Sequence, residues 1–333
     1  MRILVTGGAG YIGSHTVALL RARGDFVLVL DSMETGHREA LGDTPLVVGR
    51  THDHALVKQV IGDHHLDAII HFAAYKAAGE SMEKPGRYFQ NNVHGSLCLL
   101  EAAQQAGVRR FVFSSTAAVY GTPASLPVRE EAPLHPENPY GESKLLVEQM
   151  LRWFDACHGL RSVALRYFNA AGAALDGENG EDPGQVQNLI PLVMKAGTGR
   201  LAKVSIFGTD YPTPDGTGVR DYIHVLDLAE AHACALDFLA RHDRSNVFNL
   251  GTGKGASVLE VLREARRASG VDIPAEVVAR RPGDPPAVWA DNSKAKSVLG
   301  WQPRYGLKQI IETAWAWHKG HPDGFVTAAP SSR

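Results

Sequence analysis

The chain has 333 residues, a formal net charge of −2 and 44% hydrophobic residues. This length suits two domains, or one large α/β domain with a lobe. The balanced charge, without any basic block, argues against nucleic acid or an anionic membrane as a main partner. No apolar run reaches the ~18 residues of a membrane span, and the first residues enter a strand pattern without room for a signal peptide. We expect a cytoplasmic protein.

A glycine-rich turn follows the first apolar strand pattern, residues 2–6. Gly7, Gly10 and Gly13 are evenly spaced and lead into a helical run from Ser14 to Arg23. Glycine permits a tight turn and lets backbone N–H groups approach a pyrophosphate at a helix N-terminus. The pattern predicts a dinucleotide-binding turn.

The second strand pattern, 26–30, ends at Asp31, about 20 residues beyond the turn. A carboxylate at this place accepts hydrogen bonds from the adenosine ribose. It favours NAD over NADP, because a 2′-phosphate would meet a like charge. His37 and Arg38 are not far away, but no arginine follows Asp31 directly. NAD is the expected cofactor.

Strands and helices alternate through the rest of the first half. The expected strands are 46–49, 66–74, 110–115 and 161–167, and the expected helices are 88–107 and 139–158. Such alternation predicts an α/β fold with a Rossmann-type, doubly wound parallel sheet and right-handed crossovers.

The composition changes after residue 171. Residues 176–185 have the composition of a surface loop, and short strands at 204–207, 247–250 and 276–279 follow, with a helix at 225–240. We therefore expect an NAD-binding domain over 1–171 and a smaller C-terminal α/β lobe over 172–333 that binds substrate. Part of 222–251 should return to the sheet, and the tail from about 324 should be disordered.

Tyr140 and Lys144 lie four residues apart within the predicted helix 139–158, so they share one face. A free tyrosine titrates near pH ~10 and is a poor base at neutral pH. A neighbouring cation favours the phenolate, so the pair could remove a hydroxyl proton while a cofactor accepts a hydride.

Other polar residues fall near the carboxyl ends of the predicted strands, where open sheets bind ligands. Thr116 could hydrogen-bond a reacting hydroxyl, or it could belong to an ordinary serine/threonine turn with Ser114. Lys76 could approach the cofactor, or it could be a solvated lysine. Asn91 could satisfy backbone groups near the cofactor, or it could be merely structural.

The cysteines are Cys98, Cys157 and Cys234, an odd number that is widely spaced in helix-like stretches. They indicate reduced packing residues in a cytoplasmic protein. The 15 histidines are scattered, and His64 and His65 suit the surface better than a metal site. We expect no metal.

Gly7 to Gly13, Asp31, Tyr140 and Lys144 together resemble the extended short-chain dehydrogenase/reductase superfamily. Residues 208–225, GTDYPTPDGTGVRDYIHV, are similar to the UDP-glucose/UDP-galactose 4-epimerase family within it. The resemblance runs from Met1 to about Tyr305 without a large gap.

The resemblance implies a set of site residues. Tyr140 would be the acid/base, Lys144 its electrostatic partner and a ribose contact, and Thr116 would stand where the family usually has serine. The implied NAD contacts are Gly7, Gly10, Tyr11, Ile12, Gly13, Asp31, Arg50, Thr51, Phe72, Ala73, Ala74, Lys76, Asn91, Ser114, Tyr140, Lys144 and Phe168. The implied substrate contacts are Thr116, Tyr140, Asn169, Asn188, Leu189, Phe207, Arg220, Tyr222, Val258, Arg281, Asp284 and Val288.

The implied reaction is epimerisation at carbon 4 of a UDP-hexose. Tyr140 would take the proton of the 4-hydroxyl while NAD accepts the hydride, and the keto sugar would turn over before both return. The two arginines suit a diphosphate, because a guanidinium fork pairs with phosphate oxygens. The family also implies a homodimer, here through helices 88–107 and 139–158.

Three positions depart from the family pattern. Arg50 replaces a common aspartate that contacts the adenine amino group, and an arginine cannot accept that hydrogen bond. Ala170 replaces a frequent proline, with a minor expected effect. Val288 stands where relatives carry a bulky tyrosine or a smaller residue, so we expect UDP-N-acetylhexosamines to be tolerated as well.

Three other functions are alternatives to epimerisation of a UDP-hexose. A nucleotide-sugar 4,6-dehydratase needs an acidic pair after the fifth strand, but Thr116 is followed by Ala117 and Ala118. A uronic acid epimerase would call for an additional cation near the sugar, which leaves this alternative open. A redox-sensing regulator would bind NAD without chemistry and need not keep Tyr140 and Lys144.

Overall fold

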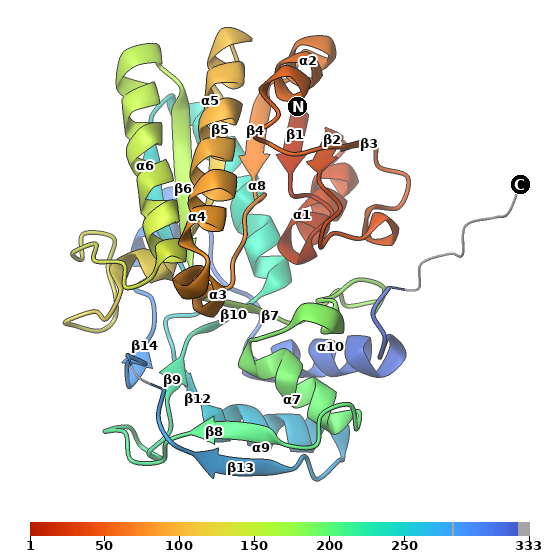
Figure 1. The fold of residues 1–333 in the computed structure, drawn as a ribbon, viewed down its shortest axis with the longest axis vertical. Helices are drawn as coiled ribbons and strands as arrows, with labels where there is room; N and C mark the ends of the chain where they lie inside the picture. The colour runs from red at the N-terminus through yellow and green to blue at the C-terminus, as the bar shows by residue number, and fades with distance from the viewer. Residues whose placement is uncertain (282, 326–333) are drawn as a thin grey trace, which may run out of the picture.

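The computed structural model describes residues 1–281 and 283–325, without the side chain of Gln185. A seven-stranded sheet and its helices form one half of the molecule, and a smaller lobe forms the other (Figure 1). The predicted α/β fold, with a Rossmann-type doubly wound parallel sheet and a smaller C-terminal lobe, is confirmed. The predicted disorder of the tail concerns residues that lie mostly outside the described ranges.

The sheet has the strand order β11-β6-β5-β4-β1-β2-β3, and every pair in it is parallel. Its strands are β1 (Arg2–Thr6), β2 (Phe26–Asp31), β3 (Leu46–Val48), β4 (Ala68–His71), β5 (Arg110–Thr116), β6 (Arg161–Tyr167) and β11 (Asn246–Leu250). Buried aliphatic residues fill both faces of the central strands, as expected where helices cover both sides.

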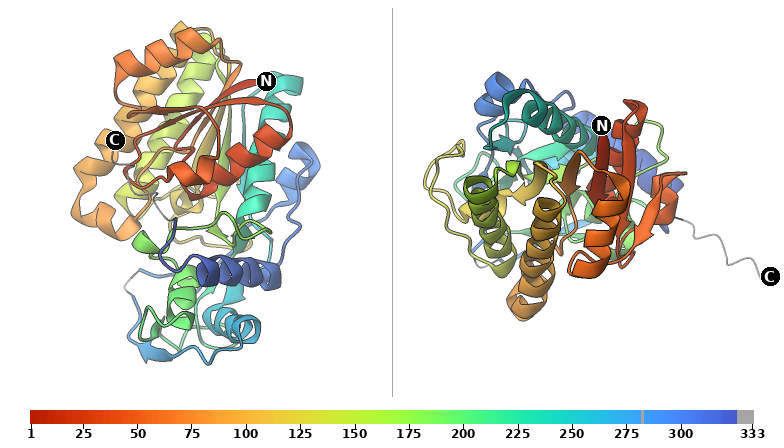
Figure 2. Two further views of the ribbon diagram at one scale, coloured as in Figure 1. Left: turned by 90° about the vertical axis from the view of Figure 1, so that its right-hand side faces the viewer. Right: turned by 90° about the horizontal axis from the view of Figure 1, so that it is seen from above.

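Two helix layers cover the sheet, as the view from above shows (Figure 2). One face carries α1 (Tyr11–Ala22) and α8 (Val225–His242), which pack together over a core that includes Val17 and Leu228. The other face carries α2 (His54–His64), α5 (Gly95–Gln105) and α6 (Pro139–His158). Two short helices, α3 (Ala78–Glu83) and α4 (Pro85–Tyr88), precede α5.

The second lobe contains α7 (Leu189–Gly197), α9 (Val258–Ser269) and α10 (Leu307–Gly320), which pack on one another. Its short strands are β7 (Asn169–Ala171), β8 (Val204–Phe207), β9 (Val219–Arg220), β10 (Tyr222–His224), β12 (Ala256–Ser257), β13 (Ala275–Val278) and β14 (Ala287–Val288). They form β10-β7, β12-β9-β14 and β13-β8 sheets. Between β10 and β12 the chain passes through α8 to β11, which pairs with β6 in the large sheet.

Three expected elements differ from the structure. The strand expected over 66–74 shrinks to β4, because the N–H groups of Phe72 and Ala73 both bond the carbonyl of Thr6. The helix expected over 88–107 contains a wider π-helical turn, Phe89–His94, before α5. The loop expected at the surface over 176–185 is partly buried, since Glu181 is only 9% exposed.

The three cysteines lie in helices and are free, as expected. Cys98 is buried in α5, but Cys157 is exposed near the end of α6, so it is not a packing residue. None of the helices over 1–281 and 283–325 combines the length and apolar character of a membrane-spanning segment.

Candidate active site

The turn between β1 and α1 must be built from glycine. Gly7 has a φ of 72°, and a Cβ there would lie 2.5 Å from the amide nitrogen of Ala73. A Cβ on Gly13 would lie 2.3 Å from the carbonyl oxygen of Gly7. A Cβ on Gly10, the residue before α1, would lie 3.4 Å from the same carbonyl oxygen. Gly10 provides no side-chain cap for the helix. This open backbone fits the pyrophosphate of a dinucleotide.

Asp31 ends β2 beside this turn and is only 8% exposed. Its two carboxylate oxygens accept hydrogen bonds from the N–H groups of Ala9 and Met33, each at 2.9 Å. Burial raises the pKa of Asp31, and both hydrogen bonds oppose that rise. The carboxylate is therefore held rigidly where a ribose hydroxyl could donate to it.

The segment after β4 borders the same turn. The ring of Phe72 packs at a tilt against the ring of His232 from α8, with 4.5 Å between the ring centres, and Ala73 lies against Gly7. Lys76 extends from this segment and lies 3.0 Å from the carboxylate of Glu181. Because Glu181 belongs to the second lobe, this ion pair crosses from the sheet to the lobe.

Tyr140 stands in the first turn of α6. Asn138 caps this helix by accepting a hydrogen bond from the N–H of Gly141, and Gly159 ends it in the left-handed conformation. The side chain of Thr116, at the end of β5, lies beside the Tyr140 phenol. Burial raises the pKa of Tyr140, while Thr116 and the ammonium of Lys76 act in the opposite direction.

Lys144 lies one turn beyond Tyr140 and is 4% exposed. Its ammonium donates a 2.8 Å hydrogen bond to the carbonyl of Ser114 and lies 4.9 Å from the centre of the Phe113 ring. Burial lowers the pKa of Lys144 to about 7. The ammonium of Lys76 is a second cation that lowers the pKa of Tyr140. The role of Lys144 as electrostatic partner of the phenol stays a prediction.

Asn92 has the central role that we expected for its neighbour Asn91. Its amide bonds both the N–H and the carbonyl of Tyr75, at 2.9 and 3.0 Å, and donates at 3.0 Å to Ser143 on α6. Asn91 donates only to the side chain of Asn92. The doubled asparagine was visible in the sequence, but which of the two faces α6 depends on the π-helical turn.

Arg50 follows β3 and points to other charged groups. Its guanidinium lies 3.0 Å from Glu34 and donates at 3.3 Å to the hydroxyl of Tyr75. Glu34 also pairs with Arg87 at 2.6 Å. Thr51, next along the chain, is buried against Gly95 of α5.

The predicted substrate residues gather in the second lobe. Arg220 pairs with Asp284 at 2.6 Å, and β9 places Arg220 opposite Val288 of β14. The guanidinium of Arg281 lies 3.8 Å above the centre of the Phe207 ring. An aromatic side chain and two arginines therefore lie together, which suits a base followed by a diphosphate.

The remaining predicted residues differ in their surroundings. Val288 and Phe168 pack on the cluster of Val119 and Tyr120 below the end of β5. Asn169 donates its N–H to the carbonyl of Asp221, and burial raises the pKa of Tyr222. The others lie at element ends: Ser114 in β5, Asn188 and Leu189 at the start of α7, and Val258 at the start of α9.

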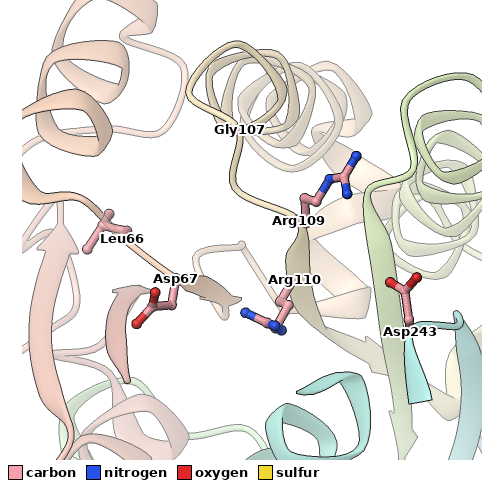
Figure 3. Close-up of a pocket in the computed structure, with 6 residues that line it drawn as sticks. All are labelled: Leu66, Asp67, Gly107, Arg109, Arg110 and Asp243. Carbon is pink, nitrogen blue, oxygen red and sulfur yellow. The ribbon is translucent and has the colours of Figure 1, made fainter. Parts of the chain in front are cut away.

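A small hollow of about 360 Å³ lies at the opposite edge of the sheet, at the amino ends of β4 and β5 (Figure 3). Arg109, Arg110, Asp67 and Asp243 line it, and none of the predicted site residues does. Within the described ranges, no three His, Cys, Asp or Glu side chains are grouped to hold a metal ion.

Comparison with known proteins places the chain among NAD-dependent enzymes. Residues 3–251 match the NAD dependent epimerase/dehydratase family. The UDP-glucose 4-epimerase of Lacticaseibacillus casei is 48% identical over 327 residues, which cover 98% of this chain and 99% of the relative.

Two solved structures are also similar. UDP-glucose-4-epimerase from Stenotrophomonas maltophila, with bound NAD and formylated UDP-arabinopyranose, is 42% identical with a TM-score of 0.94, covering 97% of this chain and 99% of that one. The UDP-Glc/GlcNAc 4-epimerase of Campylobacter jejuni is 41% identical with a TM-score of 0.86, covering 96% and 99%. This chain belongs to the NAD dependent epimerase/dehydratase family.

Proposed function

We propose that this chain interconverts UDP-glucose and UDP-galactose by reversible epimerisation at carbon 4, with NAD as its bound cofactor. The observation that carries the proposal is the approach of Thr116 and Lys76 to the Tyr140 phenol. In the second lobe, Arg220 and Arg281 supply the second requirement, a grip on a nucleotide diphosphate.

Tyr140 is the proposed acid/base. Thr116 lies beside its phenol, so a sugar hydroxyl that approaches both groups could pass its proton to Tyr140. When bound, NAD supplies the hydride acceptor and donor at the same carbon. Lys144 is the proposed electrostatic partner of the phenol and a ribose contact, and its ammonium is held by the carbonyl of Ser114.

The proposed nucleotide anchor is Arg220 with Arg281, and Asp284 is the proposed acceptor for a ribose hydroxyl. Epimerisation needs both faces of carbon 4 to be presented in turn, so the hexose has to rotate while the nucleotide stays in place. The two arginines, as a charged anchor for the diphosphate, support this division.

Val288 supports a wider substrate range. It is partly buried between the β5 end and β9, and it is smaller than a tyrosine. We propose that UDP-N-acetylhexosamines are epimerised too, as the name of the Campylobacter jejuni relative states for that enzyme.

The proposed division of labour places the NAD-binding domain in 1–171 and the nucleotide-sugar lobe in 172–333, with β11 returned to the large sheet. We also propose a cytoplasmic homodimer that joins through α5 and α6. Trp153 on α6 is 61% exposed, which supports such a contact. The three free cysteines of the chain support a reducing compartment. Light scattering tests the dimer.

The decisive experiment mixes purified protein with UDP-galactose, without added reductant, and measures UDP-glucose. Tyr140→Phe should lose this conversion by orders of magnitude while its NAD content is unchanged. Full turnover by the variant would remove the assigned base. A dehydrated product would favour a dehydratase, turnover of only uronic acid substrates would favour the uronate alternative, and no turnover by the wild type would favour a regulator.

A further inference from the structure

Helix α6 carries a buried carboxylate on the face that bears Tyr140 and Lys144. Glu148 follows Lys144 by four residues, so it lies one turn further along. Its carboxylate is 8% exposed and pairs with the 5% exposed guanidinium of Arg166 on β6, at 2.5 Å. Removing such a pair from water is costly, so its presence calls for an explanation beyond stability.

Three consecutive residues of β5 contact three successive turns of α6. Thr116 lies beside the Tyr140 phenol, and the carbonyl of Ser114 accepts from the Lys144 ammonium. Between them, the hydroxyl of Ser115 donates to Glu148 at 2.5 Å. The Glu148 carboxylate is therefore built into the same strand end that contacts Tyr140 and Lys144.

Arg166 fixes this carboxylate from the other side. Its second terminal nitrogen donates at 2.9 Å to the hydroxyl of Tyr120, which in turn donates at 2.7 Å to Asn249 of β11. The amide of Asn249 donates to the carbonyl of Val128, whose N–H bonds the carbonyl of Trp289, next to Val288. One buried network thus reaches from α6 to the sugar-side strand β14.

Among the described residues, Glu148 is the negative charge that acts on Lys144. The titratable groups on neighbouring elements are His71 on β4, Tyr167 on β6, and Tyr140 and Glu148 on α6. Burial lowers the pKa of His71 to about 3, so this ring is neutral. Burial also lowers the pKa of Lys144, and Glu148 is the charge that raises it again.

We propose that Glu148 and Arg166 are positioning residues for the proposed epimerase site, where they lock the end of β5 onto α6 and keep Lys144 charged. This inference rests on the proposed function. In this proposal neither residue contacts substrate or cofactor. Glu148 acts through Lys144, and Arg166 holds Glu148 in place and balances its buried negative charge.

The test is the pH profile of UDP-galactose turnover by NAD-loaded Glu148→Gln protein. A lysine whose pKa falls loses its proton at lower pH, so the alkaline limb of the profile should move down by roughly one pH unit. A purely structural role would lower turnover and melting temperature but leave the limb in place. An unmoved limb overturns the proposal.

Two further variants guard the result. Asp155→Asn removes a carboxylate of the same helix that lies away from Lys144 and pairs with Arg161 of β6. This variant should leave the limb unchanged. If Glu148→Gln does not fold, the double variant Glu148→Gln with Arg166→Met leaves no unpaired buried charge and should shift the limb in the same direction. An unshifted limb in the folded double variant, or an equal shift in Asp155→Asn, contradicts the inference. Absence of wild-type turnover would instead reject the proposed function.

Discussion

The ammonium of Lys76 lies 3.0 Å from the carboxylate of Glu181, although 105 positions separate them in the chain. Burial raises the pKa of Tyr11 at the N-terminus of α1, and the charge of Glu181 raises it further. A negative charge of the second lobe therefore lies near the helix end that is proposed to receive the NAD pyrophosphate, where it would compete with that anion for Lys76.

Glu181→Gln should therefore tighten NAD binding by the protein without cofactor, by roughly fivefold to tenfold, because a like charge is removed and Lys76 is freed. Quenching of tryptophan fluorescence by added NAD measures the dissociation constant. Asp182→Asn, which removes the neighbouring carboxylate that pairs with His37, is the matched control. Weaker binding by Glu181→Gln would show that Glu181 orients Lys76 instead of competing for it.

Arg50→Asp should slow the release of NAD, roughly tenfold, because an acceptor for the adenine amino group is supplied. The matched Arg50→Met variant breaks the pair with Glu34 without offering an acceptor, so it should show no such gain. The hypoxanthine analogue of NAD lacks the amino group, and its release should not slow in Arg50→Asp. If both dinucleotides were retained equally, the effect would come from charge and not from the base.

Val288→Tyr should reduce epimerisation of UDP-N-acetylglucosamine far more than that of UDP-glucose, by a factor of ten or more, since a phenol ring fills the space beside the sugar. The ratio of the two kcat/KM values measures the effect. Val288→Ile, which adds one methylene, serves as the size control. Equal losses with both substrates would place the N-acetyl group elsewhere.

Acid should unfold the protein well before its carboxylates are protonated. Burial lowers the pKa of His232, His224 and His318 to about 4, below the ordinary value of 6.5. The unfolded chain binds these protons first, so the free energy of unfolding falls as pH drops from about 6.5 towards 4, by about 1.4 kcal/mol per histidine and pH unit.

Urea titrations at pH 7 and pH 5 measure that loss. His232→Phe is the informative variant, because the Nε2 of His232 is buried without a hydrogen-bond partner among the described residues and its ring already packs at a tilt against Phe72. This variant should lose less stability between the two pH values than the wild type. An unchanged difference would mean that His232 has the same pKa in the folded and in the unfolded chain.

Local signals in the sequence carried much of the fold. Helix α6 has the predicted bounds, because Asn138, Pro139 and Gly159 mark its ends within the segment itself. The glycine turn was equally visible, since its spacing expresses a backbone requirement at Gly7 and Gly13. By contrast, the shortened β4 depends on hydrogen bonds to Thr6, which is distant in sequence and gives no local sign.

The site was predictable only where one segment supplies it. Tyr140 and Lys144 share one helix and could be paired from the sequence, but the approach of Lys76 to Tyr140 could not, because Lys76 comes from the segment after β4. Glu148 and Arg166 read as an ordinary helix acid and strand base until the fold brings them together. Pairings between distant segments leave no periodic pattern in a single sequence.

The position of β11 has a consequence for synthesis. The last strand of the large sheet, residues 246–250, emerges only after α7 and the first strands of the second lobe have been translated. A nascent chain that ends at residue 171 exposes the unpaired edge of β6. Because such an edge can pair with another chain and aggregate, a ribosome-bound chaperone would need to shield it.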